Sequence, residues 1–310
     1  MDHNPRQDEV LSAIAERGFA ILPSFLTASD LALLRQDCGR VVASSSSSFL
    51  SSCIYEPVST LTLATTSSFG SDSTAYATAR GNDNVLSLLL GHQGSGKRLL
   101  KLVRWILGEN VFVLNEQYIV KPGSKSNVNQ NVTNKKRKRR CTSRRESTDD
   151  EEEDDRDDIS DGTARTAFEW HRDADYLRKA GCTRPEAFVS VWITLDEVSS
   201  SNGTLTFSPL DAPNERVVVE EAAGTVVLIA SEVLHRSSAN VSGSSRRVWM
   251  PQYSARPQYW ESEIRKEMET ETETETETGT EKKLVALGLP CEGRMMKKQE
   301  RVVDVALEVL

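Results

Sequence analysis

The sequence predicts a mainly β fold in which N-terminal helices flank an all-β barrel or sandwich. From Val111 onward the apolar runs are short and are separated by Gly, Pro and Asn, a pattern typical of many short strands joined by turns. Before that residue the apolar positions recur at helical spacing. No apolar run reaches the roughly 20 residues that a membrane-spanning helix needs, which excludes a helical membrane protein.

Three segments in the N-terminal part are expected to be helical. Leu11, Ile14 and Ala15 mark the apolar face of the first. The second lies within 25–42 and has Thr27, Ser29 or Asp30 as its N-cap. The third covers the apolar run LLKLVRWIL at 99–107.

Short strands are expected after Val111. In AFVSVWITL, alternate residues from Ala187 to Leu195 are apolar, so this strand should turn one face to the core. The predicted strands lie within 111–120, 168–173, 187–195, 203–207, 216–220, 224–230 and 247–254.

Two low-complexity segments interrupt this pattern. The chain has 310 residues, a formal net charge of -8 and 38% hydrophobic residues, a low apolar fraction for a globular protein. Residues 124–166 join a basic block to an acidic run and are predicted to be a disordered insertion. Residues 261–283, with their Glu-Thr alternation, are predicted to be a solvated linker rather than a strand. Residues 1–123 and 167–260 then form one domain, and 284–310 a C-terminal segment that we expect to be helical.

The charged insertion bears on location and partners. The block KKRKRR from Lys135 to Arg140 fits a nuclear localisation signal. Nucleic acid is not an expected partner, because the acidic run from Asp149 to Asp158 would repel phosphates. The first ten residues lack the apolar core of a signal peptide, and the sequence ends without a peroxisomal signal. Together with five scattered cysteines, typical of reduced thiols, these features predict a cytoplasmic or nuclear protein.

A metal site can be built from two of the four histidines. His171 begins the motif HRDAD, and on a strand its side chain would share a face with that of Asp173. His235 comes where a predicted strand ends. Two histidines and one carboxylate are the facial triad of non-haem Fe(II) oxygenases. The tripeptide alone also fits an ordinary buried core histidine, and Asp175 is a competing ligand on the same predicted face.

Four segments in order resemble the phytanoyl-CoA dioxygenase family. They are NEQYIVKPG, FEWHRDADY, VSVWITLDEVSSSNGTLTFSP and GTVVLIASEVLHRSSANVSGSSRRVWMPQYS, at 115–123, 168–176, 189–209 and 224–254. Members of this family are Fe(II)- and 2-oxoglutarate-dependent oxygenases built on a double-stranded β-helix, the cupin-like jelly-roll barrel. The resemblance covers 105–256 strongly, once the insertion is removed, and 10–42 weakly.

The resemblance implies a complete set of site residues. His171, Asp173 and His235 would bind Fe(II) and form the catalytic centre. Arg246, eleven residues after His235, would bind the distal carboxylate of 2-oxoglutarate. The co-substrate would also be lined by Ser237, Gln117, Arg172 and Trp192. The reaction would hydroxylate a small organic or acyl substrate with O₂, release succinate and CO₂, and be stimulated by ascorbate.

The sequence departs from the family pattern, and two other functions compete. Arg172 stands where the family more often has Gln, and the insertion directly precedes the metal motif. One alternative is a non-catalytic jelly-roll module with a nuclear location. The other is a phosphate-binding loop, because 91–97 match GxxxxGK. Arg98 follows where that loop needs Ser or Thr, so the segment fits better a glycine-rich turn before a helix.

Overall fold

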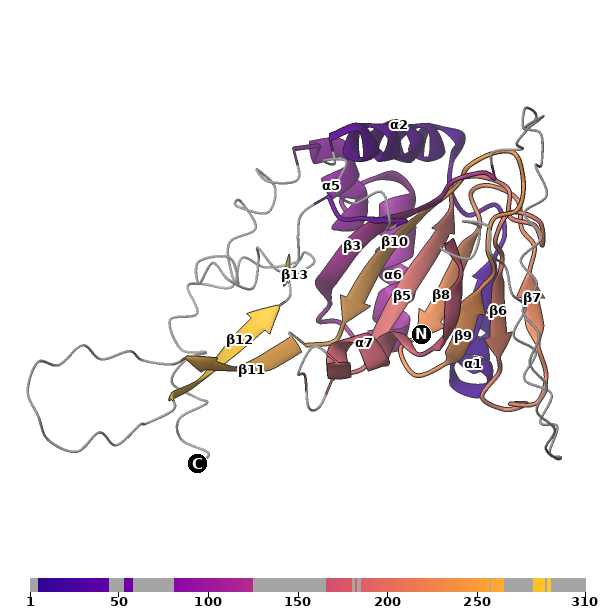
Figure 1. Cartoon of the computed structure of the whole chain (residues 1–310). Coiled ribbons are helices and arrows are strands. Elements are labelled where there is room, and N and C mark those ends of the chain that lie inside the picture. The colour runs from indigo at the N-terminus through magenta and orange to yellow at the C-terminus, as the bar shows by residue number, and fades with distance from the viewer. Residues whose placement is uncertain are drawn as a thin grey trace, which may run out of the picture.

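The protein folds into two packed antiparallel sheets with helices covering one outer face (Figure 1). The computed structural model describes residues 5–44, 53–57, 81–124, 166–179, 182 and 185–256, and the backbone of strands within 258–264, 281–287 and 289–290. Every strand pair in these ranges is antiparallel. Within them, no helix has the length and apolar character needed to cross a membrane.

The larger sheet, called the major sheet, holds most of the long strands. Its order is β1-β8-β5-β10-β3-β13, and β2 also pairs with β3. The bounds are β1 Phe19–Leu22, β2 Ile54–Tyr55, β3 Phe112–Lys121, β5 Phe188–Thr194, β8 Val226–Ala230, β10 Arg246–Ser254 and β13 Leu289–Pro290.

The smaller sheet, called the minor sheet, faces the major one. Its order is β4-β9-β6-β7, with bounds β4 Phe168–His171, β6 Leu205–Ser208, β7 Val217–Val219 and β9 Leu234–Ser237. β8 and β9 are consecutive in the chain but belong to different sheets, so the chain crosses between the sheets here. The two facing antiparallel sheets confirm the predicted jelly roll.

Helices pack on the outer face of the major sheet. They are α1 Pro5–Arg17, α2 Ala28–Ser44, α5 Asp83–Leu89 and α6 Gly94–Leu107. Their apolar side chains join those of the sheet, such as Val191 and Trp249, in one core cluster. Among the three predicted N-caps, Thr27 fills the position, because its hydroxyl accepts a hydrogen bond from the Asp30 amide at 3.1 Å.

A second core lies between the two sheets. Phe19 of β1 stacks on Phe207 of β6 with ring centroids 4.2 Å apart, and Trp192 and Ile229 belong to the same cluster. Both faces of β5 are therefore buried: one meets the helices and the other faces the space between the sheets. The alternation in AFVSVWITL had suggested only one buried face.

Several local expectations were wrong. Strands β1 and β9 were not predicted, although the equally short β4 and β6 were. The ends of the predicted linker 261–283 lie in paired strands β11 Gln258–Ile264 and β12 Glu281–Leu287. Residues 284–287 and 289–290 are in strands as well, so the expected helix is wrong there. The predicted insertion, with its basic block, lies outside the described residues apart from its two ends.

Candidate metal centre

Two histidines face each other across the minor sheet. β4 pairs with β9 so that His171 lies directly opposite His235, and their ring centroids are 4.3 Å apart. The sequence had suggested that His235 follows the end of a strand, but it lies within β9. Directly opposite side chains of an antiparallel pair share one face, so both imidazoles point to the same side of the sheet.

Asp173 reaches this pair from a helix. The chain leaves β4 after His171, and α7, Asp173–Lys179, begins at the aspartate. The prediction that Asp173 and His171 share a strand face was therefore wrong. The aspartate still converges on the histidines, because Ala174 donates its amide hydrogen to the Ser231 carbonyl at 3.0 Å and so holds the first turn of α7 against the sheet that carries β8.

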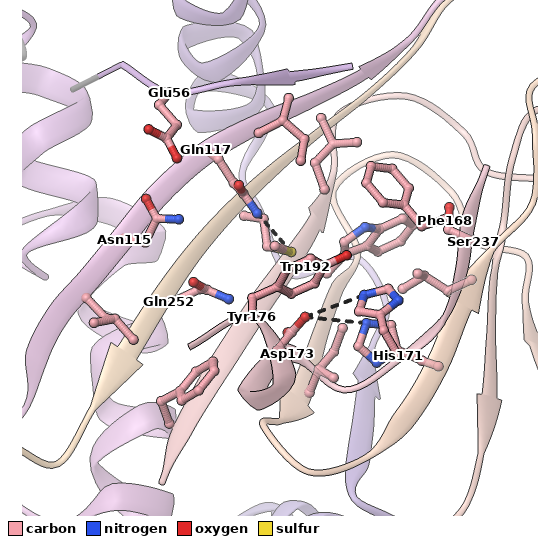
Figure 2. Close-up of a pocket in the computed structure, with 18 of the residues that line it drawn as sticks. Glu56, Asn115, Gln117, Phe168, His171, Asp173, Tyr176, Trp192, Ser237 and Gln252 are labelled. Atoms are coloured by element: carbon pink, nitrogen blue, oxygen red, sulfur yellow. Dashed lines mark hydrogen bonds and ion pairs between the residues drawn. The ribbon is translucent and has the colours of Figure 1, made fainter. Parts of the chain in front are cut away.

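The three side chains have the spacing of a metal site. Asp173 Oδ1 lies 3.7 Å from His171 Nε2 and 3.6 Å from His235 Nε2, and the ligand atoms of all three residues lie within 4.8 Å of one another. Metal–ligand bonds of about 2.1 Å place neighbouring ligands of an octahedral ion about 3 Å apart. A small inward shift would therefore let all three bind one ion. Figure 2 draws these two contacts as dashed lines from the Asp173 carboxylate, one of them to His171.

Backbone carbonyls select the imidazole tautomer that suits a metal. His171 Nδ1 lies 2.6 Å from the Glu169 carbonyl oxygen, and His235 Nδ1 lies 3.0 Å from that of Val233. A carbonyl only accepts, so each Nδ1 carries a hydrogen, and the neutral form of each ring has its lone pair on Nε2, the atom nearer Asp173. Burial, and then the nearby His235, lower the pKa of His171. Its imidazole is therefore neutral at pH 7, as metal binding requires.

Two buried cations lie near one another beside this cluster. Arg246 of β10 pairs in register with Lys121 of β3, and both side chains are almost fully inaccessible. Arg246 Nη2 donates to the Gly203 carbonyl at 2.6 Å, whereas Nη1 is buried and has no hydrogen-bond partner among the described residues. Lys121 Nζ donates to Ser237 Oγ at 2.5 Å and to the backbone carbonyls of Ser237 and Ser238.

The electrostatics of this pair call for an anion. Burial, and next the charge of Arg246, lower the pKa of Lys121 to about 7. Burial lowers the pKa of Arg246 to about 10, so the guanidinium stays charged at neutral pH. A buried charge without a counter-ion is costly. A carboxylate placed at Arg246 Nη1 would satisfy the free donor and neutralise the excess positive charge.

One cavity connects the metal cluster to Arg246. It has a volume of about 280 Å³, and its wall includes all three candidate metal ligands together with Arg246 and Ser237. Apolar side chains form much of the remaining wall, among them Leu114, Phe168, Phe188, Ile229 and Met250. The cavity thus combines a metal-binding group, an anion-binding group and an apolar space.

The other predicted site residues divide into two groups. Gln117 and Trp192 line the cavity, and the Trp192 ring lies 5.5 Å from the Arg246 guanidinium carbon (Figure 2). Arg172 is not brought to the cavity: its side chain is exposed and donates through Nε to the Glu232 carbonyl at 3.1 Å. Asp175 points away too, forming an ion pair with Arg178 at 3.0 Å, so it does not compete as a ligand.

The phosphate-loop alternative is not supported. A helix, α5, precedes the glycine-rich segment 91–97, whereas a phosphate loop follows a strand. Gly94 and Gly96 lie in the first turn of α6, with Gln93 as N-cap. Gly96 is needed for packing, because a Cβ there would lie 2.8 Å from Leu88 Cα. The glycine-rich turn before a helix is the better interpretation.

Sequence reasoning missed several residues of the site. Lys121 is one of them, because a lysine at the end of the mixed strand FVLNEQYIVK is not unusual in itself. Tyr176 packs edge-on against the His171 ring at 5.2 Å and is 52% exposed, which places it at the rim of the cavity. Ser190 and Gln252 also belong to the site, but no local pattern marks them.

Comparisons with known proteins agree with this geometry. The family model for phytanoyl-CoA dioxygenase (PhyH) matches residues 157–248, which include the three candidate ligands and Arg246. No curated protein matches the chain significantly. Among solved structures, the epimerase SnoN in complex with Fe³⁺, alpha ketoglutarate and nogalamycin RO has a TM-score of 0.54 at 12% identity, covering 93% of this chain and 99% of its own.

Two further structures share the fold. EctD from S. alaskensis with 2-oxoglutarate and 5-hydroxyectoine has a TM-score of 0.52 at 17% identity, covering 83% of this chain and 79% of that one. The carbocyclase SnoK from nogalamycin biosynthesis has a TM-score of 0.52 at 15% identity, covering 84% and 87%. At these identities the likeness establishes the fold.

Proposed function

We propose that this chain, whose residues 157–248 match the family model for phytanoyl-CoA dioxygenase, is an Fe(II)- and 2-oxoglutarate-dependent oxygenase that hydroxylates a small organic or acyl substrate. One observation carries the proposal. A His-Asp-His cluster and a buried arginine with a free donor lie on the wall of the same cavity.

His171, Asp173 and His235 are the residues that would hold Fe(II). The set of two imidazoles and one carboxylate suits non-haem Fe(II) and leaves positions on the ion for other ligands. The backbone carbonyls of Glu169 and Val233 hold the imidazoles with Nε2 toward Asp173 before any metal arrives. When bound, Fe(II) and 2-oxoglutarate supply the oxidising chemistry, in which O₂ is consumed and succinate and CO₂ are released.

Arg246 is the proposed anchor for the distal carboxylate of 2-oxoglutarate. A planar guanidinium matches a carboxylate in geometry, and burial strengthens the interaction. Lys121 adds a second positive charge and holds Ser237, whose hydroxyl lines the cavity. Trp192 packs near the guanidinium and limits access of water to it. We also assign Gln117 to the co-substrate, since it lies on the cavity wall.

The volume and lining of the cavity bear on the substrate. At about 280 Å³ the cavity is at the small end for ligand pockets. After 2-oxoglutarate has taken the part beside Arg246, the remaining space admits a small molecule or one end of an acyl chain. The apolar wall near Leu114 and Phe188 favours a hydrocarbon surface facing the metal cluster.

Succinate release tests this function directly. The purified chain, supplied with Fe(II), 2-oxoglutarate, ascorbate and air, should form succinate slowly alone and faster with a substrate from a panel of small apolar acids, amines, alcohols and acyl-CoA esters. The Asp173→Ala variant is the control and should form none. If no succinate forms under any of these conditions, the proposal is wrong.

A further inference from the structure

We infer that Ser190 and Gln252 are positioning residues for the metal ligand Asp173. They form a hydrogen-bonded relay that fixes which carboxylate oxygen faces the histidines. The inference rests on the proposed metal site and goes beyond it, because neither residue belongs to the ligand set or to the co-substrate anchor.

The relay runs through three side chains from three different elements. Gln252 Nε2 of β10 lies 2.8 Å from Ser190 Oγ of β5, and Ser190 Oγ lies 2.5 Å from Asp173 Oδ2 at the start of α7. β5 and β10 are paired so that Gln252 lies directly opposite Ser190. The two side chains therefore share the face of the major sheet that borders the cavity.

The direction of each hydrogen bond follows from the chemistry of the groups. An ionised carboxylate only accepts, so the single hydroxyl hydrogen of Ser190 must go to Asp173. The Ser190 oxygen is then left as an acceptor, and Gln252 must present its amide nitrogen to it. Each link thus determines the next, and the relay has one orientation.

This arrangement leaves the two oxygens of Asp173 with different roles. Oδ2 is engaged by Ser190, whereas Oδ1 lies 3.7 Å and 3.6 Å from Nε2 of His171 and His235. The carboxylate therefore offers a single oxygen to the metal position. Ser190 is the side chain that donates a hydrogen bond to this carboxylate within the described part of the chain, so its loss would free the carboxylate to rotate at the first residue of α7.

The relay starts and ends at the cavity wall and passes through the protein interior. Gln252 is half-buried and lines the cavity, while Ser190 is fully buried. Figure 2 shows Gln252 on the side of Asp173 that is away from His171. A buried serine could also serve packing alone, so the test must separate positioning from stability.

Ser254 provides a matched control for such a test. It lies on β10, is fully buried, and donates its hydroxyl to the Arg256 carbonyl at 2.6 Å. Ser254→Ala removes a buried hydroxyl hydrogen bond without touching the relay. Ser190→Ala removes a comparable hydroxyl that reaches Asp173, and Gln252→Met removes the outer donor from a half-buried position while keeping the length of the side chain.

The experiment measures Co(II) binding to the metal-free full-length chain by calorimetry and visible absorption. Residues that hydrogen-bond to a metal ligand contribute about 10–100-fold to metal affinity. We expect Ser190→Ala to bind Co(II) about 10–100-fold more weakly with an altered d–d spectrum, and Gln252→Met to show a smaller loss of about 3–10-fold. Ser190→Thr, which keeps the hydroxyl, should restore the spectrum, and Ser254→Ala should bind as the wild type does.

Three outcomes would overturn the inference. If folded Ser190→Ala keeps wild-type affinity and spectrum, the relay does not position the ligand, and the proposed function is unaffected. If Ser190→Ala fails to fold, Gln252→Met and Ser190→Thr decide instead. Wild-type Co(II) affinity in Gln252→Met then counts against the relay. If the wild-type chain itself binds no Co(II) or Fe(II), the proposed function fails and the relay with it.

Discussion

Arg246 and Lys121 lie opposite each other on β10 and β3, both almost fully buried, with one guanidinium nitrogen lacking a hydrogen-bond partner among the described residues. Two like charges on the same buried face destabilise the protein unless an anion lies beside them. The pair therefore favours a bound carboxylate, and its Arg246 lines the same cavity as the cluster of candidate metal ligands.

Loss of Arg246 should weaken 2-oxoglutarate binding strongly. A hydrogen bond to a charged group contributes about 1.5–3 kcal/mol, which corresponds to roughly 10–150-fold in affinity. Arg246→Met should therefore raise the dissociation constant for 2-oxoglutarate at least about 10-fold, as measured by calorimetry with the metal site saturated. Arg247→Met is the matched control, since the neighbouring arginine pairs with Asp196 at 2.7 Å outside the cavity. Equal effects of the two substitutions would count against the anchor.

Affinity for 2-oxoglutarate should fall as the pH rises above about 7. The pKa of Lys121 is lowered to about 7 by burial and then by Arg246, so the free protein loses this positive charge above that pH. Binding a carboxylate nearby then requires uptake of a proton, and the affinity drops by at most about tenfold per pH unit. Calorimetry at about pH 8 in buffers of different ionisation enthalpy should show this uptake, and Lys121→Met should abolish it. A wild-type affinity that is flat from about pH 6 to 9 would contradict this prediction.

Replacement of any candidate ligand should remove metal binding. His171→Ala, Asp173→Ala and His235→Ala each delete one of three convergent donors, so the loss of Co(II) affinity should exceed the roughly 100-fold expected for a residue that only hydrogen-bonds to a ligand. Asp175→Ala is the control: it removes an acidic residue two positions on, which pairs with Arg178 instead. Comparable loss in the Asp175 variant would show that the site has been placed wrongly.

Two glycines should respond in opposite ways to substitution by alanine. A Cβ at Gly96 would collide with the backbone of Leu88, so Gly96→Ala should lower the free energy of unfolding by about 1–3 kcal/mol through overpacking. Gly39 is exposed on α2, and a methyl group there would have nothing within 4 Å. Gly39→Ala should therefore raise the free energy of unfolding by about 0.5–1 kcal/mol. Urea denaturation measures both. Similar changes for the two variants would contradict the packing described for α5 and α6.

The sequence predicted the fold better than it predicted the details of the site. Long strands such as β3 and β10 follow from their own apolar pattern, and the order of four segments indicated the jelly roll. Strand β9 has the sequence LHRS, with a single apolar residue, so it carries no apolar pattern from which a strand could be recognised. Asp173 was expected on a strand because spacing alone does not distinguish a strand from a turn into a helix.

The residues that sequence reasoning missed depend on contacts between distant elements. Lys121 becomes notable only when β10 places Arg246 opposite it. Ser190 and Gln252 are 62 residues apart and meet because β5 and β10 pair in one register. Arg172 was assigned to the co-substrate by position in a motif, yet the turn into α7 directs it outward.

Anaerobic binding of 2-oxoglutarate in the presence and absence of Fe(II) tests the central claim most directly. If His171, Asp173 and His235 hold the metal beside the Arg246 anchor, 2-oxoglutarate should bind at one site per chain, much more tightly with Fe(II) than without. The same titration should give a visible absorption band for the Fe(II) complex that is absent in Asp173→Ala. Binding that is independent of Fe(II), or no binding at all, would contradict the account.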